Sequence, residues 1–278
     1  PAEDNPWASP VSAAMTTAAL AAINAEARAA DPGLTALQAR VLDALRRAYD
    51  PAPQAFAPDL PPAAQGLVAW ALVHAASLDP SFTRARAESA VRAAFRNTPQ
   101  PQLVAQTPFL VWAELALNPA GDLPSAAALD GMRSMVWDHQ LTRPDLRAVD
   151  QDFAGGIVFT RGPSVLPTWH TMRPLAALAS MLGDERLTPG TAVDGRAPGE
   201  LVRLTDGLRF VRQLALTDEA LFLARHPGAA EWGVRPALWE PTASVEAAAM
   251  ALLTACETLD AMRAVAARSS AAQPDRPQ

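Results

Sequence analysis

The sequence predicts an all-α protein, and three observations lead to this fold class. Five prolines each head a stretch rich in alanine and leucine, at Pro10, Pro61, Pro108, Pro167 and Pro241. Proline suits the first turn of a helix, where its missing N–H would be unpaired anyway. Alanine, which has the highest helix propensity, is abundant. Runs of the β-branched and aromatic residues that are typical of strands are nearly absent.

Between these prolines the chain is long enough for one helix out, a turn and one helix back. Helices of a different character, richer in arginine and acidic residues, are expected at residues 35–49, 82–97, 126–141 and 200–216. In the first of them, Leu37, Val41 and Leu45 fall at helical spacing among polar residues. This pattern is typical of a helix with one buried stripe and one solvated face.

The proline-led stretches are instead apolar over most of their circumference, as residues 66–76 illustrate. A helix of this kind must be buried on all sides, so these stretches are expected to form an inner layer. Inner and outer helices then alternate along the chain, which gives either an open solenoid or a closed ring.

The two ends of the chain differ in character from its helical middle. Residues 1–9 are expected to be a linker, residues 10–268 one helical domain and residues 269–278 a disordered tail. The first residues are polar and contain proline, as in linkers and mature secreted proteins, which favours a periplasmic or secreted location over a cytoplasmic one. No uninterrupted apolar segment reaches the length of a transmembrane helix.

Charge and cysteine content exclude several kinds of partner and site. The formal net charge is −6, and no basic run is longer than Arg46-Arg47, so a nucleic-acid partner is not expected. Cys256 is the single cysteine, so neither an intrachain disulfide nor a thiolate metal cluster can form. Its apolar helical context predicts a buried, inert thiol.

The last two proline-led units match each other in sequence. The matching pairs are Gly156-Ile157 with Gly233-Val234, and Pro167 with Pro241. Each unit enters its helix through a long irregular stretch, residues 142–166 and 226–240. Loops of this length inside a compact domain are often functional, so a site is expected at these two units.

Ligand-binding side chains are predicted where the helices of these two units begin. Aromatic, imidazole and guanidinium groups on irregular backbone beside a cavity are typical of a ligand site. Pro174 removes one helical hydrogen bond, so the helix is expected to be kinked there or to begin there. The residues predicted to bind a ligand are Trp169, His170, Arg173, Arg235 and Trp239. For the first three, the alternative is a structural role in packing and in capping the Gly-Gly loop.

Two short motifs, Asp152-Phe-Ala-Gly-Gly-Ile and Pro167-Thr-Trp-His-Thr-Met-Arg-Pro-Leu, stand in these units. In them the chain resembles the α/α-toroid proteins of the squalene cyclase and prenyltransferase-like superfamily, in particular an uncharacterised bacterial branch. The resemblance implies an α/α toroid of alternating inner and outer helices with a central cavity. About five hairpins fall short of a full ring, so an incomplete ring, a pairing with another chain and a degenerate further unit stay open.

The catalytic motifs that such a resemblance brings into view are incomplete in this chain. Terpene cyclases of this superfamily use an Asp-x-Asp-Asp motif, whereas here Phe153 follows Asp150-Gln151-Asp152. Asp152 is therefore expected to cap a turn, or the glycine loop Gly155-Gly156, through backbone N–H groups. The prenyltransferase zinc ligands are also incomplete around the single cysteine. No metal and no cofactor are predicted.

The sequence therefore predicts a non-catalytic α/α-toroid binding or assembly module. Its loops at one end would contact a protein partner or a hydrophobic ligand. The alternative is an enzyme that acts in the toroid cavity on an isoprenoid or a glycan. In that case Asp152, His170 and Glu246 are the candidate catalytic residues. The carboxylates expected near the axis are Glu114, Asp152 and Glu246, and His170 is expected near the mouth.

Overall fold

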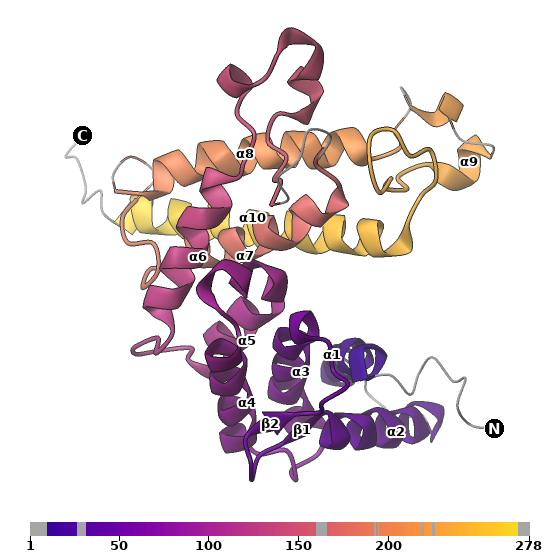
Figure 1. The fold of residues 1–278 in the computed structure, drawn as a ribbon, viewed down its shortest axis with the longest axis vertical. Coiled ribbons are helices and arrows are strands. Elements are labelled where there is room, and N and C mark those ends of the chain that lie inside the picture. Colours follow the sequence, from indigo (N-terminus) through magenta and orange to yellow (C-terminus); the bar gives the residue numbers. More distant parts are fainter. Residues whose placement is uncertain are drawn as a thin grey trace. The chain divides into compact units, whose positions relative to one another are not determined.

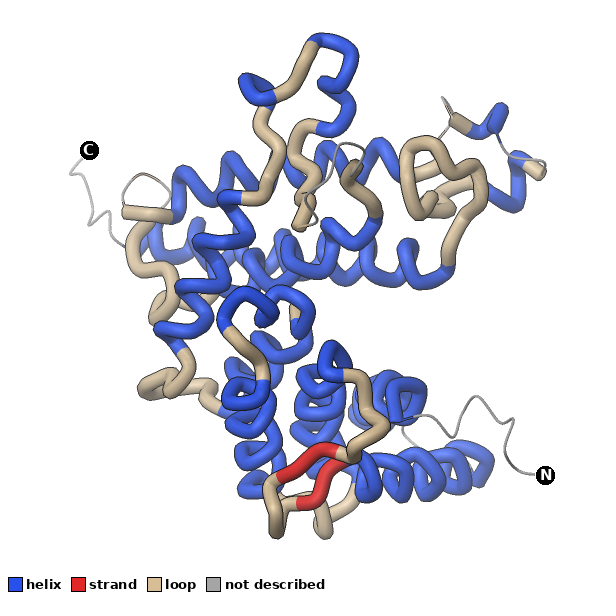
Figure 2. The backbone as a smooth tube through the Cα atoms, in the orientation of Figure 1, coloured by secondary structure: helices blue, strands red, loops and turns tan. Residues whose placement is uncertain are grey.

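The structure is a computed structural model that describes residues 10–26, 32–159, 166–191, 193, 195–217, 220–223 and 226–271. These residues are mostly helical, which confirms the all-α prediction (Figure 2). The predicted linker 1–9 lies outside the described residues, as does most of the predicted tail 269–278. Helix α10 continues into the start of that tail as far as Ala271.

Two compact units make up the chain, Pro1–Ala128 (unit 1) and Leu129–Gln278 (unit 2). The α-helices of unit 1 are shown in Figure 1 and are α1 (Pro10–Glu26), α2 (Pro32–Ala48), α3 (Gln65–Leu78), α4 (Arg84–Asn97) and α5 (Phe109–Leu117). The α-helices of unit 2 are α6 (Ala126–Asp138), which begins at the boundary, α7 (Met172–Gly183), α8 (Ala197–Leu214), α9 (Pro227–Ala230) and α10 (Val245–Ala271).

Short elements connect these helices. A two-stranded antiparallel sheet in unit 1 pairs β1 (Tyr49–Asp50) with β2 (Ala55–Phe56), and Tyr49 lies opposite Phe56. The 3₁₀ helices are Pro62–Ala64, Gln100–Gln106, Arg143–Asp145, Ala148–Phe153, Trp169–Thr171 and Leu221–Leu223. Ala148–Phe153 lies in the stretch 142–166, which the sequence predicts to be irregular.

Helix α3 is the centre of unit 1. It packs against α1, α2, α4 and α5, and its side chains are buried around most of its circumference. Val68 and Ala71 are fully inaccessible to solvent. This placement agrees with the prediction that the helix led by Pro61 belongs to an inner layer, with α2 and α4 as the more polar helices.

Helices α7 and α10 form the core of unit 2, and α8 packs against both. The hydroxyl of Thr254 in α10 donates a hydrogen bond to the carbonyl of Met172 in α7 (3.0 Å). Gly207 allows α8 to approach α7, because a Cβ at this position would lie 2.7 Å from side-chain carbons of Leu175. The core of unit 2 is therefore built from helices of both sequence repeats.

The start of α7 differs from the expected break at Pro174. The 3₁₀ helix Trp169–Thr171 leads directly into α7, which begins at Met172. Pro174 thus falls within the first turn of the α-helix, where a missing N–H removes no intrahelical hydrogen bond.

Helix α10 corrects the expectation that every proline-led helix is buried on all sides. One stripe of this helix is buried, and it includes Ala247, Met250, Thr254, Thr258, Ala261 and Val265. The opposite side is apolar but exposed, and Leu252 retains 66% of its accessible surface. Cys256 is also exposed, so the prediction of a buried thiol is wrong. Alanine and leucine all around the helix hid this asymmetry.

Arginine side chains from neighbouring elements cap the C-terminal ends of several helices. The last carbonyls of a helix have no partner inside the helix, and a guanidinium provides several donors for them. Arg268, for example, donates to the carbonyls of Leu182 (2.9 Å) and Gly183 (3.2 Å) at the end of α7. Each bond joins two elements, so arginine holds the helices of each unit in register. The capping pairs are Arg86 with α2, Arg84 with α5, Arg203 with α6, Arg268 with α7 and Arg235 with α8.

Candidate functional site

The two matching sequence repeats both lie in unit 2 and have the same backbone geometry at the entry to α7 (the first repeat) and to α10 (the second repeat). In the first repeat Gln140 and Ile157 form an isolated antiparallel bridge. The N–H of Leu141 donates to the carbonyl of Gly156 (2.8 Å), which closes the base of the long loop that follows α6. Thr171 then ties this base to α7, because its hydroxyl accepts the N–H of Ile157 (3.0 Å).

The second repeat has the same arrangement after α8. Ala215 and Val234 form the isolated antiparallel bridge, and the N–H of Leu216 donates to the carbonyl of Gly233 (2.7 Å). The N–H of Ser244 donates to the carbonyl of Val234 (2.8 Å) and ties the bridge to the start of α10. The repeat that the sequence predicts at Gly156-Ile157 and Gly233-Val234 is therefore a structural repeat.

A left-handed backbone conformation occurs at the same point of both repeats. The N–H of Gly155 donates to the carbonyl of Leu141, and the N–H of Trp232 donates to the carbonyl of Leu216. Gly155 has φ +89° and Trp232 has φ +65°. Glycine is required in the first repeat, because a Cβ on Gly155 would lie 1.9 Å from the carbonyl oxygen of Asp206. In the second repeat the same position is occupied by tryptophan, the largest side chain.

Trp232 is therefore both strained and exposed. A bulky residue with positive φ is an outlier, and the left-handed conformation costs about 1–2 kcal/mol in a residue other than glycine. Packing does not compensate for this cost, because 71% of the Trp232 surface is accessible. Backbone strain of this kind is characteristic of functional sites.

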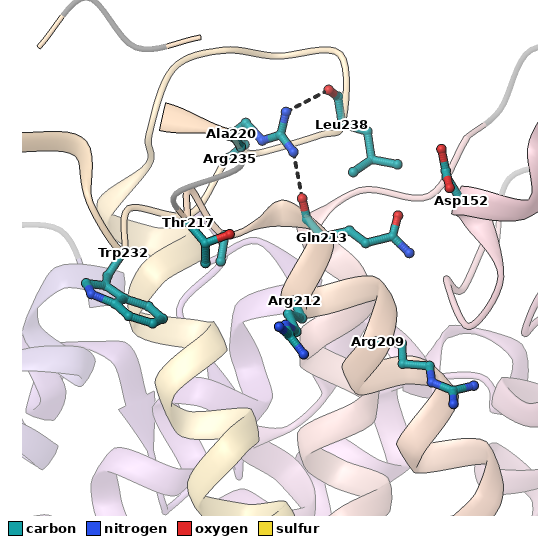
Figure 3. Close-up of a pocket in the computed structure, with 10 residues that line it drawn as sticks. Asp152, Arg209, Arg212, Gln213, Thr217, Ala220, Trp232, Arg235 and Leu238 are labelled. Atoms are coloured by element: carbon teal, nitrogen blue, oxygen red, sulfur yellow. Dashed lines mark hydrogen bonds between the residues drawn. The ribbon is translucent and has the colours of Figure 1, made fainter. Parts of the chain in front are cut away.

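Trp232 stands at the edge of an open cavity of about 840 Å³ in unit 2. Figure 3 shows Arg209, Arg212 and Gln213 along α8, with the loop that carries Arg235 and Leu238 above them. The described residues that line the cavity are Asp152, Arg209, Arg212, Gln213, Ala215, Thr217, Ala220, Trp232, Arg235 and Leu238. Segments from both repeats contribute to this lining.

Arg235 joins the loop of the second repeat to the end of α8. Its side chain is buried, and its two terminal nitrogens donate to the carbonyls of Gln213 (2.6 Å) and Leu238 (3.1 Å). Its Nε has no hydrogen-bond partner within the described part of the chain. Burial lowers the pKa of Arg235 below its usual value. The guanidinium therefore carries a positive charge at a position where water solvates it poorly.

The other arginines of the cavity lie on α8. Arg209 is paired with Asp206 on the same helix (3.0 Å). Arg212 is exposed in the last turn of α8 and forms no ion pair with any described residue. Asp152, from the first repeat, is the acidic group among the described lining residues. The described lining is therefore more basic than acidic, in a chain whose formal net charge is −6.

Of the five predicted ligand-binding residues, Arg235 is the one found in the described lining of the cavity. The Trp169 and His170 rings lie 4.3 Å apart, and the N–H of Trp169 donates to the carbonyl of Pro236 (2.8 Å). Arg173 and the burial of His170 both hold the pKa of His170 below its usual value, and burial has the larger effect. Trp239 is 56% exposed. Trp169, His170, Arg173 and Trp239 are not among the described lining residues.

The three candidate catalytic residues are not brought together around this cavity. Asp152 lines it, whereas His170 and Glu246 do not. Glu246 lies in the first turn of α10 and accepts a hydrogen bond from the Ser244 hydroxyl (2.8 Å), which lowers the pKa of Glu246. The prediction that Asp152 caps the glycine loop is wrong, because the N–H groups of that loop donate to backbone carbonyls instead.

The sequence did not single out Arg209, Arg212 or Trp232. The two arginines belong to the solvated face of a predicted outer helix, and their only signal was a position directly before an irregular loop. For Trp232 a signal existed in the sequence. It precedes Gly233-Val234, just as Gly155 precedes the matching pair Gly156-Ile157 in the first repeat. The sign of φ that makes this substitution unusual is a property of the fold.

The described residues contain no group of three or more His, Cys, Asp or Glu side chains placed to hold a metal ion. None of the helices they form is both long enough and apolar enough to cross a membrane.

Comparison with known proteins gives no relative for this chain. No protein-family model, no curated protein and no solved structure matches it.

Proposed function

We propose that this chain is a non-catalytic binding module that contacts a protein partner through the loops around the cavity of unit 2. The observation that carries the proposal is Trp232, which is exposed, has φ +65° and occupies the position of Gly155 in the first repeat. Tryptophan and arginine are the residues most enriched at the energetic centres of protein interfaces. Here Trp232 stands beside Arg212 and Arg235 at one cavity.

The composition of the lining favours a protein partner over a hydrophobic ligand. Sites for small apolar ligands are enclosed and lined mostly by apolar side chains. This cavity is open, and half or more of its described lining is charged or polar, including Asp152, Arg209 and Arg212. A partner that brings both polar and aromatic groups to an open surface fits these features better.

The same geometry favours binding over catalysis. General acid–base chemistry needs two groups within reach of one bound substrate. Among Asp152, His170 and Glu246, Asp152 is the one that lines the cavity. The enzyme alternative therefore has no observation that favours it over the binding module.

For the arrangement of the hairpins, the α/α toroid implied by the resemblance is our proposal. It is supported by the alternation of apolar and more polar helices within each unit. In unit 1 the buried helix α3 packs against α1 and α5, and in unit 2 α7 packs against α10. An experimental structure of the full chain tests whether the hairpins form a ring.

A peptide-display library panned on the purified full chain tests the binding module. We expect selected peptides to bind with one-to-one stoichiometry in calorimetry and to be recovered with unchanged mass. Hydrogen exchange should show protection in residues 209–217 and 232–239 when a peptide is bound. A library that yields no binder, or binders that protect other segments, would contradict the proposal. A peptide recovered with an altered mass would contradict its non-catalytic part.

A further inference from the structure

The cavity of unit 2 has an excess of positive charge that its described residues do not neutralise. Arg209 is balanced by Asp206 on the solvent-exposed face of α8. Arg212 and Arg235 form no ion pair with any described residue, and Asp152 is the acidic group of the described lining. Asp218 and Glu219, which follow Thr217 in the sequence, lie outside the described residues.

Arg235 makes this excess significant, because its charge is fixed in a poorly solvated position. It is 7% exposed, and the partners of its terminal nitrogens are the neutral carbonyls of Gln213 and Leu238. A buried cation that no described anion neutralises is unfavourable, and a bound anion removes part of that penalty. Arg212 can supply a direct charge-assisted bond from the exposed side of the same cavity.

Trp232 adds an aromatic surface to this charged cavity. Its ring is exposed, its backbone has a positive φ, and it belongs to the described lining of the cavity. Tryptophan offers a large apolar face to a flat or apolar group at low conformational cost. A ligand that satisfies both features must carry an anionic group and an aromatic or apolar group next to each other.

We propose that the cavity binds an acidic peptide segment, with a carboxylate at Arg212 and a neighbouring aromatic side chain against Trp232. This inference rests on the proposed binding function and names the chemistry of the partner. A peptide fits better than a free metabolite because the cavity is open and spans the distance from Trp232 to Asp152 across α8 (Figure 3).

A fluorescein-labelled peptide of glutamates around one tyrosine is the probe, and fluorescence anisotropy with the full chain is the measurement. We expect Arg212→Glu to weaken binding by about tenfold or more, because it removes a charge-assisted hydrogen bond and adds a repulsion. Arg263→Glu is the matched control, since it makes the same charge change at an exposed site on α10 and should stay within about twofold. The same peptide with glutamine in place of glutamate should bind at least about tenfold more weakly than the acidic one.

A double-mutant cycle tests the aromatic contact. Replacing the peptide tyrosine by serine should weaken binding to the wild-type chain but have little effect on Trp232→Ser. Arg212 lies in the last turn of α8, where a cation also suits the helix dipole, so circular dichroism of Arg212→Glu and of Arg212→Gln must show an intact fold. Loss of binding in both folded variants assigns Arg212 to the ligand.

Several outcomes would overturn the inference and leave the proposed function standing. These are equal binding of the glutamine peptide, equal effects of Arg212→Glu and Arg263→Glu, and library-selected peptides that protect the loops but carry no acidic residues. Tighter binding of a phosphotyrosine peptide or of a single-stranded oligonucleotide would assign the site to phosphate instead. If no peptide of any charge protects residues 209–217 and 232–239, the binding module itself is wrong.

Discussion

In unit 2 the guanidinium of Arg133 lies 3.5 Å from Oε1 of Glu200, and both side chains are buried. Arg133 also donates to the carbonyl of Leu187 (3.0 Å), which ties α6 to the turn after α7. Removing one partner of a buried ion pair leaves the other charge uncompensated. This pair therefore links three segments of unit 2 in a way that its sequence separation conceals.

We expect Arg133→Met to reduce the free energy of unfolding of unit 2 by about 3–5 kcal/mol, because Glu200 would, among the described residues, keep only the half-exposed Arg196, 3.9 Å away, as an ion-pair partner. Arg196→Met is the control. Arg196 is half exposed, is paired with Asp130 and lies 3.9 Å from the same Glu200 oxygen, so it shares the carboxylate but not the burial of Arg133, and its loss should cost less than about 1 kcal/mol. Urea unfolding followed by circular dichroism measures both variants. A cost below about 1 kcal/mol for Arg133→Met would show that the pair contributes no net stability.

The same carboxylate predicts an unusual pH dependence. Burial raises the pKa of Glu200 above its usual value of 4.5, and the attraction of Arg133 opposes but does not cancel this effect. Between 4.5 and the raised pKa the folded protein binds more protons than the unfolded chain does. The contribution of Glu200 to stability is therefore largest at low pH and falls as pH rises through this window.

Urea midpoints of the wild-type chain and of Glu200→Gln, measured as a function of pH, test this expectation. The difference between the two curves should move in favour of Glu200→Gln as pH rises above the usual glutamate pKa. A difference that is constant with pH would mean that Glu200 titrates in the folded state as it does in the unfolded chain.

Gly155 and Gly199 predict opposite effects of the same substitution. Gly155→Ala places a Cβ 1.9 Å from the carbonyl oxygen of Asp206 at φ +89°, so we expect a loss of about 2–4 kcal/mol. At Gly199, in α8, a Cβ has no neighbour within 4 Å. Gly199→Ala should therefore stabilise the protein by about 0.5–1 kcal/mol through helix propensity. Thermal unfolding of the two variants should give shifts of opposite sign, and a neutral Gly155→Ala would contradict the repeat geometry.

Much of this fold was readable from the sequence, because helix starts and apolar periodicity are local signals. Pro10, Pro61 and Pro108 each precede or begin a helical segment, and Gly156-Ile157 and Gly233-Val234 mark equivalent bridges. The exposed side of α10 was not readable, since Leu252 and Leu259 have the same local context as buried residues. Which side of an apolar helix is covered depends on the helices packed against it.

The candidate site was readable in part for the same reason. Arg235 stood in an irregular loop and was predicted, whereas Arg212 stood in a regular amphipathic helix and was not. It lines the cavity because α8 ends beside the loop of Trp232, which is a tertiary relationship. His170 and Glu246 were selected by residue type, and the fold separates them from the cavity that Asp152 lines.

Cys256 provides a simple test of the exposed face of α10. Its thiol is exposed, so we expect a maleimide to modify the folded protein to completion and mass spectrometry to find one adduct. The unfolded chain in urea gives the reference rate. Labelling that needs urea would show that this face is covered in solution, and the exposed side of α10 would then have to be a contact surface.

Trp232 gives a prediction in which stability and function change in opposite directions. Trp232→Asn should raise the free energy of unfolding by about 0.5–1 kcal/mol, because asparagine tolerates positive φ and the exposed ring contributes little packing. Trp232→Gly should gain less, since glycine also increases the entropy of the unfolded chain. Thermal unfolding measures both, with Trp239→Asn as the control for loss of an exposed tryptophan.

A residue kept for packing would show the reverse behaviour. If Trp232→Asn lowered the stability by more than about 1 kcal/mol, the ring would have a structural role and its strain would be offset by contacts. If the variant is more stable and binds the acidic peptide more weakly, the strain at Trp232 is maintained for binding. This opposition of signs is the signature of a residue selected for function at the expense of stability. It would distinguish Trp232 from Gly155, where the close approach of the Asp206 carbonyl leaves no room for a Cβ and so requires glycine.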